Sequence, residues 1–184
     1  METILKIDTM ILDFIQNYLR CGFLDSLFVF ITKLGDMGLI WILITLVFLA
    51  TDKYRKAGSA MAIGLFICLI LGNEVLKEVF ARPRPFQASE FSLIIAPPSG
   101  YSFPSGHTMS SFAAATSMGL SHKRLSKWGY ILAGLIAFSR MYLYVHFPSD
   151  IIAGALLGVG IAFLARYITN KMPFFKGEKK ILTE

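Results

Sequence analysis

Long apolar stretches constrain this chain more than any other feature of its sequence. They are residues 22–34, 38–51, 58–80, 105–120, 127–145 and 150–168. A helix needs about 20 mostly apolar residues to cross a bilayer, and the first two stretches are short for that, so their ends stay open. Hydrophobic residues make up 55% of the 184 and charged residues 16%, against about 45–50% and about 25% in soluble domains. We therefore expect an all-α integral membrane bundle of six transmembrane helices, not a disordered chain, a coiled coil or a charged nucleic-acid module.

An amphipathic stretch precedes these segments. Apolar residues such as Ile4, Ile7 and Ile11 recur at helical spacing, and Asp8 and Asp13 occupy other faces. We expect residues 1–20 to form an amphipathic helix at the membrane interface, with a kinked extension of the first span as the alternative. No cleaved signal peptide is expected, because acidic residues interrupt the apolar run. With no repeat or linker visible, residues 1–184 are expected to form a single domain.

The basic residues are distributed unevenly among the predicted connections. The chain has 18 Lys and Arg against 12 Asp and Glu, a net charge of +6. Lysines and arginines cluster in residues 52–57, in residues 121–127 and in a basic tail at 170–184, all on one side of a six-helix bundle. By the positive-inside rule that side is cytoplasmic. The charge thus reflects topology and requires no nucleic-acid partner, and the multi-pass protein is expected in the plasma membrane.

Three short motifs carry candidate chemistry, and all map to the opposite, extracytoplasmic end. The first runs from Lys77 to Arg84-Pro85, the second is Pro104-Ser105-Gly106-His107, and the third is Ser139-Arg140 with His146 and Asp150. They match KxxxxxxRP, PSGH and SRxxxxxHxxxD, so the sequence resembles the type 2 phosphatidic acid phosphatase superfamily of membrane lipid phosphatases. All eleven fixed positions of that signature are present.

The residue types suit phosphate chemistry in their own right. A phosphate monoester carries about −1.5 to −2 charges at neutral pH, and Lys77, Arg84 and Arg140 supply three positive charges. Arginine matches phosphate oxygens with a fork of donors, whereas lysine acts as a point charge. Ser105 and Gly106 open a helix whose free N–H groups are expected to face the anion. We predict that these five residues bind phosphate.

Two histidines fall inside the motifs and are predicted to share the catalysis. Pro148 suits the start of a helix, which places Asp150 in its first turn, where it can orient His146. His146 is then the nucleophile that attacks phosphorus, and His107 is the acid that protonates the leaving oxygen. These assignments match the roles that the resemblance implies.

Each of these residues also has an ordinary structural explanation. Lys77 near a span end commonly just extends to the interface, a histidine beside a proline turn is commonly a loop residue, and Asp150 alone resembles a helix cap. The complementary chemistry of the three motifs favours the catalytic interpretation. Arg82 stays ambiguous between a contact behind the site and a contact with a lipid headgroup.

No metal or other cofactor is expected. The carboxylates near the site show no spacing typical of a metal cage, so the basic side chains are expected to replace a metal ion. Cys21 and Cys68 lie in apolar surroundings away from any Cys/His cluster, and both are interpreted as buried free thiols.

The predicted protein is a membrane enzyme whose partners are the bilayer and a lipid phosphate. The substrates that the resemblance implies include undecaprenyl diphosphate, phosphatidylglycerophosphate and phosphatidate, and the sequence does not choose among them. The alternatives are a soluble phosphatase or haloperoxidase with the same pocket, which the apolar segments disfavour, and a non-catalytic lipid or phosphate carrier, which the two histidines disfavour. Gly154 and Gly158 form a GxxxG motif for helix packing within the bundle or at a dimer contact, so the oligomeric state stays open.

Overall fold

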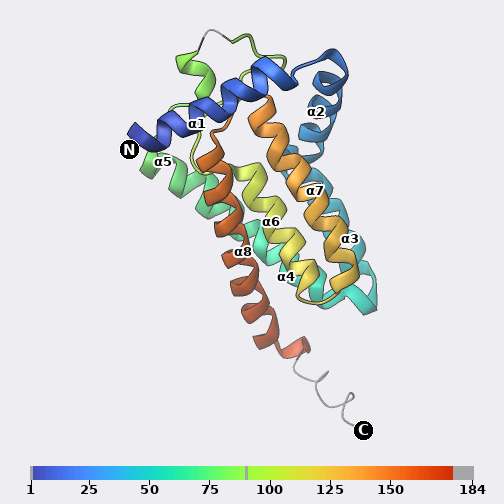
Figure 1. Ribbon diagram of the computed structural model, residues 1–184. Coiled ribbons are helices and arrows are strands. Elements are labelled where there is room, and N and C mark those ends of the chain that lie inside the picture. Colours follow the sequence, from blue (N-terminus) through green and yellow to red (C-terminus); the bar gives the residue numbers. More distant parts are fainter. Residues whose placement is uncertain (1, 90, 176–184) are drawn as a thin grey trace.

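The computed structural model describes residues 2–89 and 91–175, and every regular element in those ranges is a helix (Figure 1). The all-α prediction is therefore confirmed for the described chain, whereas most of the predicted basic tail lies outside it. The main helices are α1 (Glu2–Phe14), α2 (Gly22–Gly35), α3 (Leu39–Ala50), α4 (Arg55–Cys68), α5 (Lys77–Phe80), α6 (Gly106–Gly119), α7 (Lys123–Tyr142) and α8 (Pro148–Lys171). Short 3-10 or π-helical turns are η1 (Ile15–Leu19), η2 (Asp36–Gly38), η3 (Asp52–Tyr54), η4 (Leu69–Leu76), η5 (Pro85–Ala88) and η6 (Pro173–Phe175).

Within the described part of the chain, three helical stretches are long and apolar enough to cross a membrane. They are Gly22–Ala50, Asp52–Ala88 and Pro148–Lys171, each with a mean hydropathy of 2.0 over its most apolar window. The chain is thus an all-helical membrane protein, but the predicted count of six transmembrane helices is not confirmed.

Helices α2 and α3 account for much of this difference. Met37 and Gly38, in the turn between them, adopt left-handed backbone conformations with φ of 52° and 72°. The turn bends the chain without reversing it, because Gly35 faces His107 and Trp41 donates a hydrogen bond to Ser111, further along α6 in the same direction. The two segments expected at 22–34 and 38–51 therefore form one kinked helix.

Helix α6 lies at the centre of the bundle, where it packs against α4, α7 and α8. Its Ala113, Ala114 and Ala115 are completely buried. Gly158 of α8 allows backbone contact with α6, because a Cβ there would lie 2.3 Å from the carbonyl oxygen of Met109. The GxxxG motif is therefore confirmed as a packing motif within the bundle.

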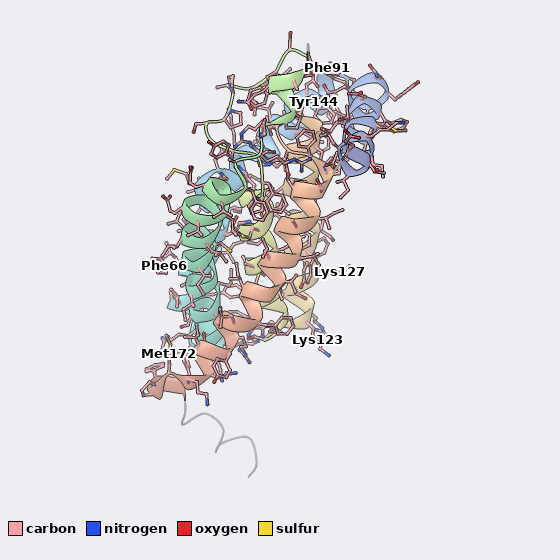
Figure 2. The ribbon with its side chains drawn as sticks, turned by 90° about the vertical axis from the view of Figure 1, so that its left-hand side faces the viewer. Phe66, Phe91, Lys123, Lys127, Tyr144 and Met172 are labelled. Atoms are coloured by element: carbon pink, nitrogen blue, oxygen red, sulfur yellow. The ribbon has the colours of Figure 1, made fainter. Side chains whose placement is uncertain are left out.

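The basic connections gather at one end of the bundle. Tyr54 of η3 packs edge-on against His122, with ring centroids 4.6 Å apart, and Arg166 of α8 donates a hydrogen bond to Ser121. Figure 2 shows Lys123 at this end and Tyr144 at the opposite one. The prediction that connections 52–57 and 121–127 share one end is confirmed.

Helix α1 crosses over the opposite end of the bundle instead of extending α2 (Figure 1). Its Leu12 faces the bundle and is fully buried, whereas the side chains of Ile4, Ile7 and Met10 are exposed. An exposed apolar face at the end of a membrane bundle is typical of a helix that lies in the interface. The structure thus has an amphipathic helix over Glu2–Phe14, and its place at the membrane interface stays a prediction.

Candidate active site

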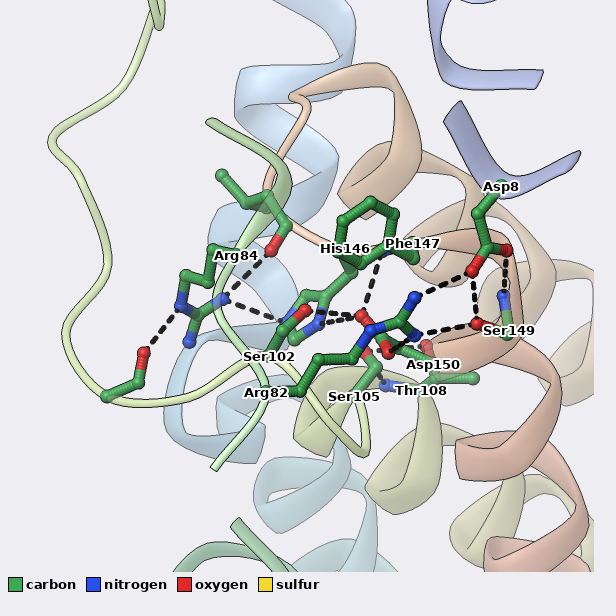
Figure 3. Close-up of polar contacts among 12 residues, drawn as sticks. Asp8, Arg82, Arg84, Ser102, Ser105, Thr108, His146, Phe147, Ser149 and Asp150 are labelled. Carbon is green, nitrogen blue, oxygen red and sulfur yellow. Dashed lines mark hydrogen bonds and ion pairs between the residues drawn. The ribbon is translucent and has the colours of Figure 1, made fainter. Parts of the chain in front are cut away.

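The three motifs meet at the end of the bundle that α1 covers. The second and third are joined by a backbone hydrogen bond from Ser105 N to the carbonyl oxygen of Asp150, 3.2 Å long. The first reaches them through Arg84, whose Nη1 lies 3.2 Å from His146 Nε2. Segments that are far apart in the sequence thus build one polar cluster (Figure 3).

The start of α8 fixes Asp150. Pro148 is the first residue of the helix, as predicted, and Asp150 lies in its first turn. There its Oδ2 accepts a hydrogen bond of 2.8 Å from the backbone N–H of Phe147. A carboxylate in this place stabilises the N-terminus of the helix, and the same bond holds it next to residue 146.

His146 lies between Asp150 and Arg84, with a side chain that is 2% exposed. Its Nδ1 is 3.5 Å from Asp150 Oδ2, and its Nε2 is 3.2 Å from Arg84 Nη1. Because a guanidinium only donates hydrogen bonds, we infer that Nε2 is the acceptor and that the ring proton lies on Nδ1, towards the carboxylate. This tautomer leaves the Nε2 lone pair directed at the cationic part of the site.

The surroundings keep this imidazole neutral. Burial lowers the pKa of His146 to about 3, and the positive charges of Arg140 and Arg84 act in the same direction against the opposing effect of Asp150. A neutral ring is the form that has a nucleophilic lone pair. His146 is therefore held in the form that its predicted role as nucleophile requires.

Arg82 resolves the ambiguity that the sequence left. Its Nη1 donates to Asp150 Oδ1 at 2.6 Å and its Nη2 to Asp8 Oδ2 at 2.8 Å, while its guanidinium lies 4.0 Å from the centre of the Phe147 ring (Figure 3). Asp8 of α1 also accepts a hydrogen bond of 2.9 Å from the backbone of Ser149. Arg82 thus links the N-terminal helix to Asp150.

Sequence reasoning missed Asp8 and Ser102, another donor to Asp150. No motif signals Asp8, which lies in a helix interpreted only as amphipathic. Ser102 stands outside the fixed positions of the signature, although it is only two residues from Pro104. Both become visible only when the chain folds.

His107 has a carboxylate of its own. It is the second residue of α6, and its Nε2 lies 2.9 Å from Asp36 Oδ1 in the kink between α2 and α3. The ring packs so close to Gly35 that any side chain there would collide with it. Nothing in the spacing of the sequence pairs Asp36 with a residue 71 positions away.

Two arginines of the motifs are buried beside the histidines. Arg84 Nε and Nη2 donate to the carbonyl oxygens of Gly100 and Ser99, so this side chain also shapes the loop before the second motif. Arg140 donates to Thr32, and its buried Nε has no hydrogen-bond partner among the described residues. A buried guanidinium N–H without a partner is suited to bind an anion.

Lys77 and Ser105 complete the cationic side of the site. Lys77 is the first residue of α5. It lies close enough to Arg84 and Arg140 for their positive charges to repel its own. Ser105 caps α6 as predicted, because its hydroxyl oxygen accepts a hydrogen bond from Thr108 N, and Gly106 follows as the first helical residue. The structure thus brings all the predicted site residues to one region.

Among residues 2–89 and 91–175, no group of three or more His, Cys, Asp or Glu side chains is placed to hold a metal ion. Both cysteines are free thiols, but only Cys68 is buried. Cys21 is exposed, which corrects the prediction, because it directly precedes α2 at the edge of the bundle.

Comparison with known proteins identifies the family. A sequence model of the PAP2 superfamily matches residues 53–173, which include all three motifs. The chain belongs to the PAP2 superfamily. The match excludes α1, α2 and α3, so the contributions of Asp8 and Asp36 to the site come from outside the part that defines the family.

Individual relatives of this PAP2 protein cover most of its length. It is 38% identical over 167 residues to the undecaprenyl-diphosphatase of Sulfolobus acidocaldarius, covering 90% of this chain and 80% of the relative. It is 32% identical to phosphatidylglycerophosphatase B of Bacillus subtilis, covering 86% and 81%. The crystal structure of a PAP2-type phosphatidylglycerolphosphate phosphatase from Bacillus subtilis superposes with a TM-score of 0.74 at 28% identity, over 95% of this chain and 90% of that one. This PAP2 protein is accordingly a membrane lipid phosphatase.

Proposed function

We propose that this PAP2 protein hydrolyses the diphosphate of a prenyl lipid, with undecaprenyl diphosphate as the first candidate. The 38% identity to an undecaprenyl-diphosphatase supports that choice. Phosphatidylglycerophosphate is the second candidate, which the Bacillus subtilis relatives support. The observation that carries the catalytic proposal is the position of His146, with Nδ1 turned to Asp150 and Nε2 to Arg84.

The phosphoryl group is held by Lys77, Arg84 and Arg140 together with the start of α6. Phosphoryl transfer depends chiefly on neutralising the oxygens and aligning the nucleophile with the leaving group. The arginines supply directed donors, Lys77 supplies charge, and the N-terminus of α6 at Ser105 and Gly106 supplies backbone N–H groups and its positive dipole end. These fixed cations replace a divalent ion.

In the first step His146 Nε2 attacks phosphorus. A bond forms between Nε2 and phosphorus while the bond from phosphorus to the leaving oxygen breaks, and His107 gives that oxygen a proton. Asp150 keeps the proton of His146 on Nδ1 and stabilises the positive charge that develops on the ring. The product of this step is a phosphohistidine together with the lipid monophosphate, or with the lipid alcohol when the substrate is a monophosphate.

In the second step water hydrolyses the phosphohistidine. His107 has lost its proton and now accepts one from the water as the oxygen attacks phosphorus. The phosphorus–nitrogen bond breaks, inorganic phosphate leaves, and both histidines return to their starting states. Asp36 orients the ring of His107 in both steps.

We assign the site to the extracytoplasmic face of the plasma membrane. The basic connections lie at the opposite end of the bundle, and basic connections favour the cytoplasm. On this orientation the enzyme acts on lipid phosphates in the outer leaflet, and α1 lies along the outer interface.

The test is release of phosphate by detergent-purified protein from undecaprenyl diphosphate, phosphatidylglycerophosphate and phosphatidate, combined with rapid quenching of a labelled, activated phosphate ester. We expect acid-labile, base-stable label on the wild-type protein and on His107→Ala, because an activated leaving group needs little protonation. No label is expected on His146→Ala.

Three results would contradict parts of this proposal. Label on His146→Ala that is absent from His107→Ala would reverse the two roles. Turnover without label in any variant would indicate direct attack by water. Failure to release phosphate from all three lipids would refute the substrate assignment.

A further inference from the structure

The basic end of the bundle carries more positive charge than its described acidic residues balance. This end consists of η3, the first turns of α4 and α7, and the last turns of α8, and Figure 2 shows Lys123 and Met172 at it. Asp52 is the one acidic residue that the described part of the chain places there, and it pairs with Arg55. The basic residues of this end are Lys53, Arg55, Lys56, Lys123, Arg124, Lys127, Arg166 and Lys171. The positive-inside rule explains on which side they lie, but it does not require them to share one surface.

Contacts between three segments build one surface at this end. Arg166 Nη1 of α8 donates a hydrogen bond of 2.8 Å to Ser121 Oγ, in the connection between α6 and α7. In the same connection the His122 ring packs against Tyr54, just before α4, with ring centroids 4.6 Å apart. The start of α4, the start of α7 and the end of α8 therefore lie together, although they are far apart in the sequence.

Aromatic rings accompany the charged groups of this surface. Arg55 Cζ lies 5.9 Å from the centre of the Phe174 ring, and Lys171 Nζ lies 5.4 Å from the centre of the Tyr167 ring. Both rings are exposed, and so is Trp128 near the start of α7. Aromatic side chains are enriched where a bilayer meets water. Their positions indicate that the basic surface lies at the level of the lipid headgroups.

Arg166 is the basic residue of this surface that reaches furthest into the bundle. It lies five residues before the end of α8, which is about 8 Å at about 1.5 Å per residue, and it is half-buried. The neutral hydroxyl of Ser121 is its one side-chain partner among residues 2–89 and 91–175. A guanidinium has further N–H donors in a fork that matches phosphate oxygens. Arg166 can therefore bind a phosphate that approaches between the helix ends.

We propose that the basic end binds the headgroup of an anionic phospholipid. The basic residues match its phosphodiester, and the exposed rings beside them match the carbons next to the headgroup, which a soluble anion lacks. Basic surfaces between transmembrane helices are known to hold anionic headgroups in this way. The surface is separate from the catalytic residues, because Asp150 and Arg166 are about 24 Å apart along α8.

The inference goes beyond the proposed function and does not depend on it. On the proposed orientation the ligand is a lipid of the cytoplasmic leaflet. A headgroup that contacts α4, α7 and α8 together holds three segments of the bundle in place, so its binding should stabilise the folded protein.

The experiment titrates cardiolipin into the detergent-purified protein and follows the Tm, with phosphatidylcholine as the zwitterionic comparison. Cardiolipin is a suitable probe because it has phosphodiesters but no terminal phosphate that a lipid phosphatase could remove. We expect cardiolipin to raise the Tm and phosphatidylcholine not to do so. The shift should be smaller at high salt, because salt screens exposed charges.

Two substitutions each remove one charge from the surface, Lys123→Gln and Arg166→Gln. Each should weaken the binding of cardiolipin by about fivefold, the factor that corresponds to one basic residue near an anionic surface. Lys6→Gln is the matched control, because Lys6 and Lys123 are both exposed near the start of a helix but α1 lies at the opposite end. Its affinity for cardiolipin should stay within about twofold of the wild type.

Lys123→Gln keeps the test decisive if Arg166→Gln does not fold, since the Lys123 side chain is exposed. Its release of phosphate from a soluble ester should equal that of the wild type, which shows that the catalytic end is intact. Binding of cardiolipin by Lys123→Gln as tightly as by the wild type would overturn the assignment, as would the same loss in Lys6→Gln.

Three further results would also overturn it. One is the absence of any Tm shift with cardiolipin. Another is a shift that vanishes when vanadate is added, because the lipid would then occupy the catalytic pocket. The third is an equally large shift with soluble pyrophosphate that Lys123→Gln weakens, because the ligand of the basic end would then be a soluble anion.

Discussion

Each histidine of the site lies beside its own carboxylate: His107 Nε2 is 2.9 Å from Asp36 Oδ1, and His146 Nδ1 is 3.5 Å from Asp150 Oδ2. The two pairs differ in their surroundings. Asp150 is completely buried among donors, whereas the side chain of Asp36 is 57% exposed and that of His107 is 20% exposed. An acid that exchanges protons with a leaving group and with water benefits from that access, and a nucleophile benefits from the fixed position of His146.

We expect Asp36→Asn to slow the reaction by impairing proton transfer. General acid–base catalysis contributes about 10² to 10⁴ in rate. A His107 ring that is no longer oriented should lower the rate by about tenfold. The loss should be large on lipid substrates and small on an ester with an activated leaving group. Equal losses on both substrates would show that Asp36 serves the fold and not His107.

The pKa of His146 predicts how stability depends on pH. The unfolded value is about 6.5 and the folded value is about 3, so folding favours the neutral ring. This stabilisation is complete above about pH 6.5 and is lost as the pH falls towards the folded value. Between pH 7.5 and pH 5 in detergent, we expect the Tm of the wild type to fall more than that of His146→Gln. Parallel curves would contradict the burial of a neutral His146.

Among the helices, α1 contributes a residue to the polar network of the site. Its Asp8 holds Arg82, which in turn holds Asp150. We expect Asp8→Asn to lower kcat by about tenfold, because a hydrogen bond between charged groups contributes about 1.5–3 kcal/mol. KM for a soluble ester should not change, since Asp8 does not contact the phosphate cradle.

Asp13→Asn is the control for Asp8→Asn. Asp13 also ties α1 to the bundle, by accepting a hydrogen bond of 2.9 Å from Tyr144 Oη, but it does not reach Asp150. If both variants lose activity to the same extent, α1 acts only as a tether. Rescue of Asp8→Asn by Asp8→Glu would further support its action through Arg82.

The sequence predicted the elements that local signals define. Pro148 marked the start of α8, Ser105 marked the start of α6, and the glycines of α8 marked a close helix contact whose partner the structure shows to be α6. Apolar patterning could not distinguish a hairpin from a kink at residues 36–38, because both need a turn with glycine. The partners Asp8 and Asp36 depend on contacts between distant segments, which no local pattern encodes.

The orientation of the protein in the membrane can be tested with cysteine labelling of intact cells in a Cys21→Ser background. Cys68 is buried and should stay silent. We expect a membrane-impermeant reagent to label Ala88→Cys, in an exposed position near the site, and not Lys123→Cys at the basic end. The opposite pattern would invert the proposed orientation.

Metal removal tests the whole cationic site. On the proposed mechanism Lys77, Arg84 and Arg140 neutralise the phosphate, so we expect activity to persist in excess chelator and vanadate to inhibit by occupying the same pocket. Dialysis against chelator, followed by assay with and without added magnesium or zinc, measures this. Activity that is lost and then restored only by a metal would contradict the proposed role of the three cations.

The contact between Asp8 and Ser149 joins residues 141 positions apart, and this separation has a consequence for biosynthesis. The ribosome makes Asp8 long before Ser149 and Asp150, so the contacts between α1 and the start of α8 form late. Contacts of such long range also form slowly. On the proposed mechanism, a nascent or truncated chain without α8 lacks the carboxylate that orients His146, so activity requires the insertion of α8.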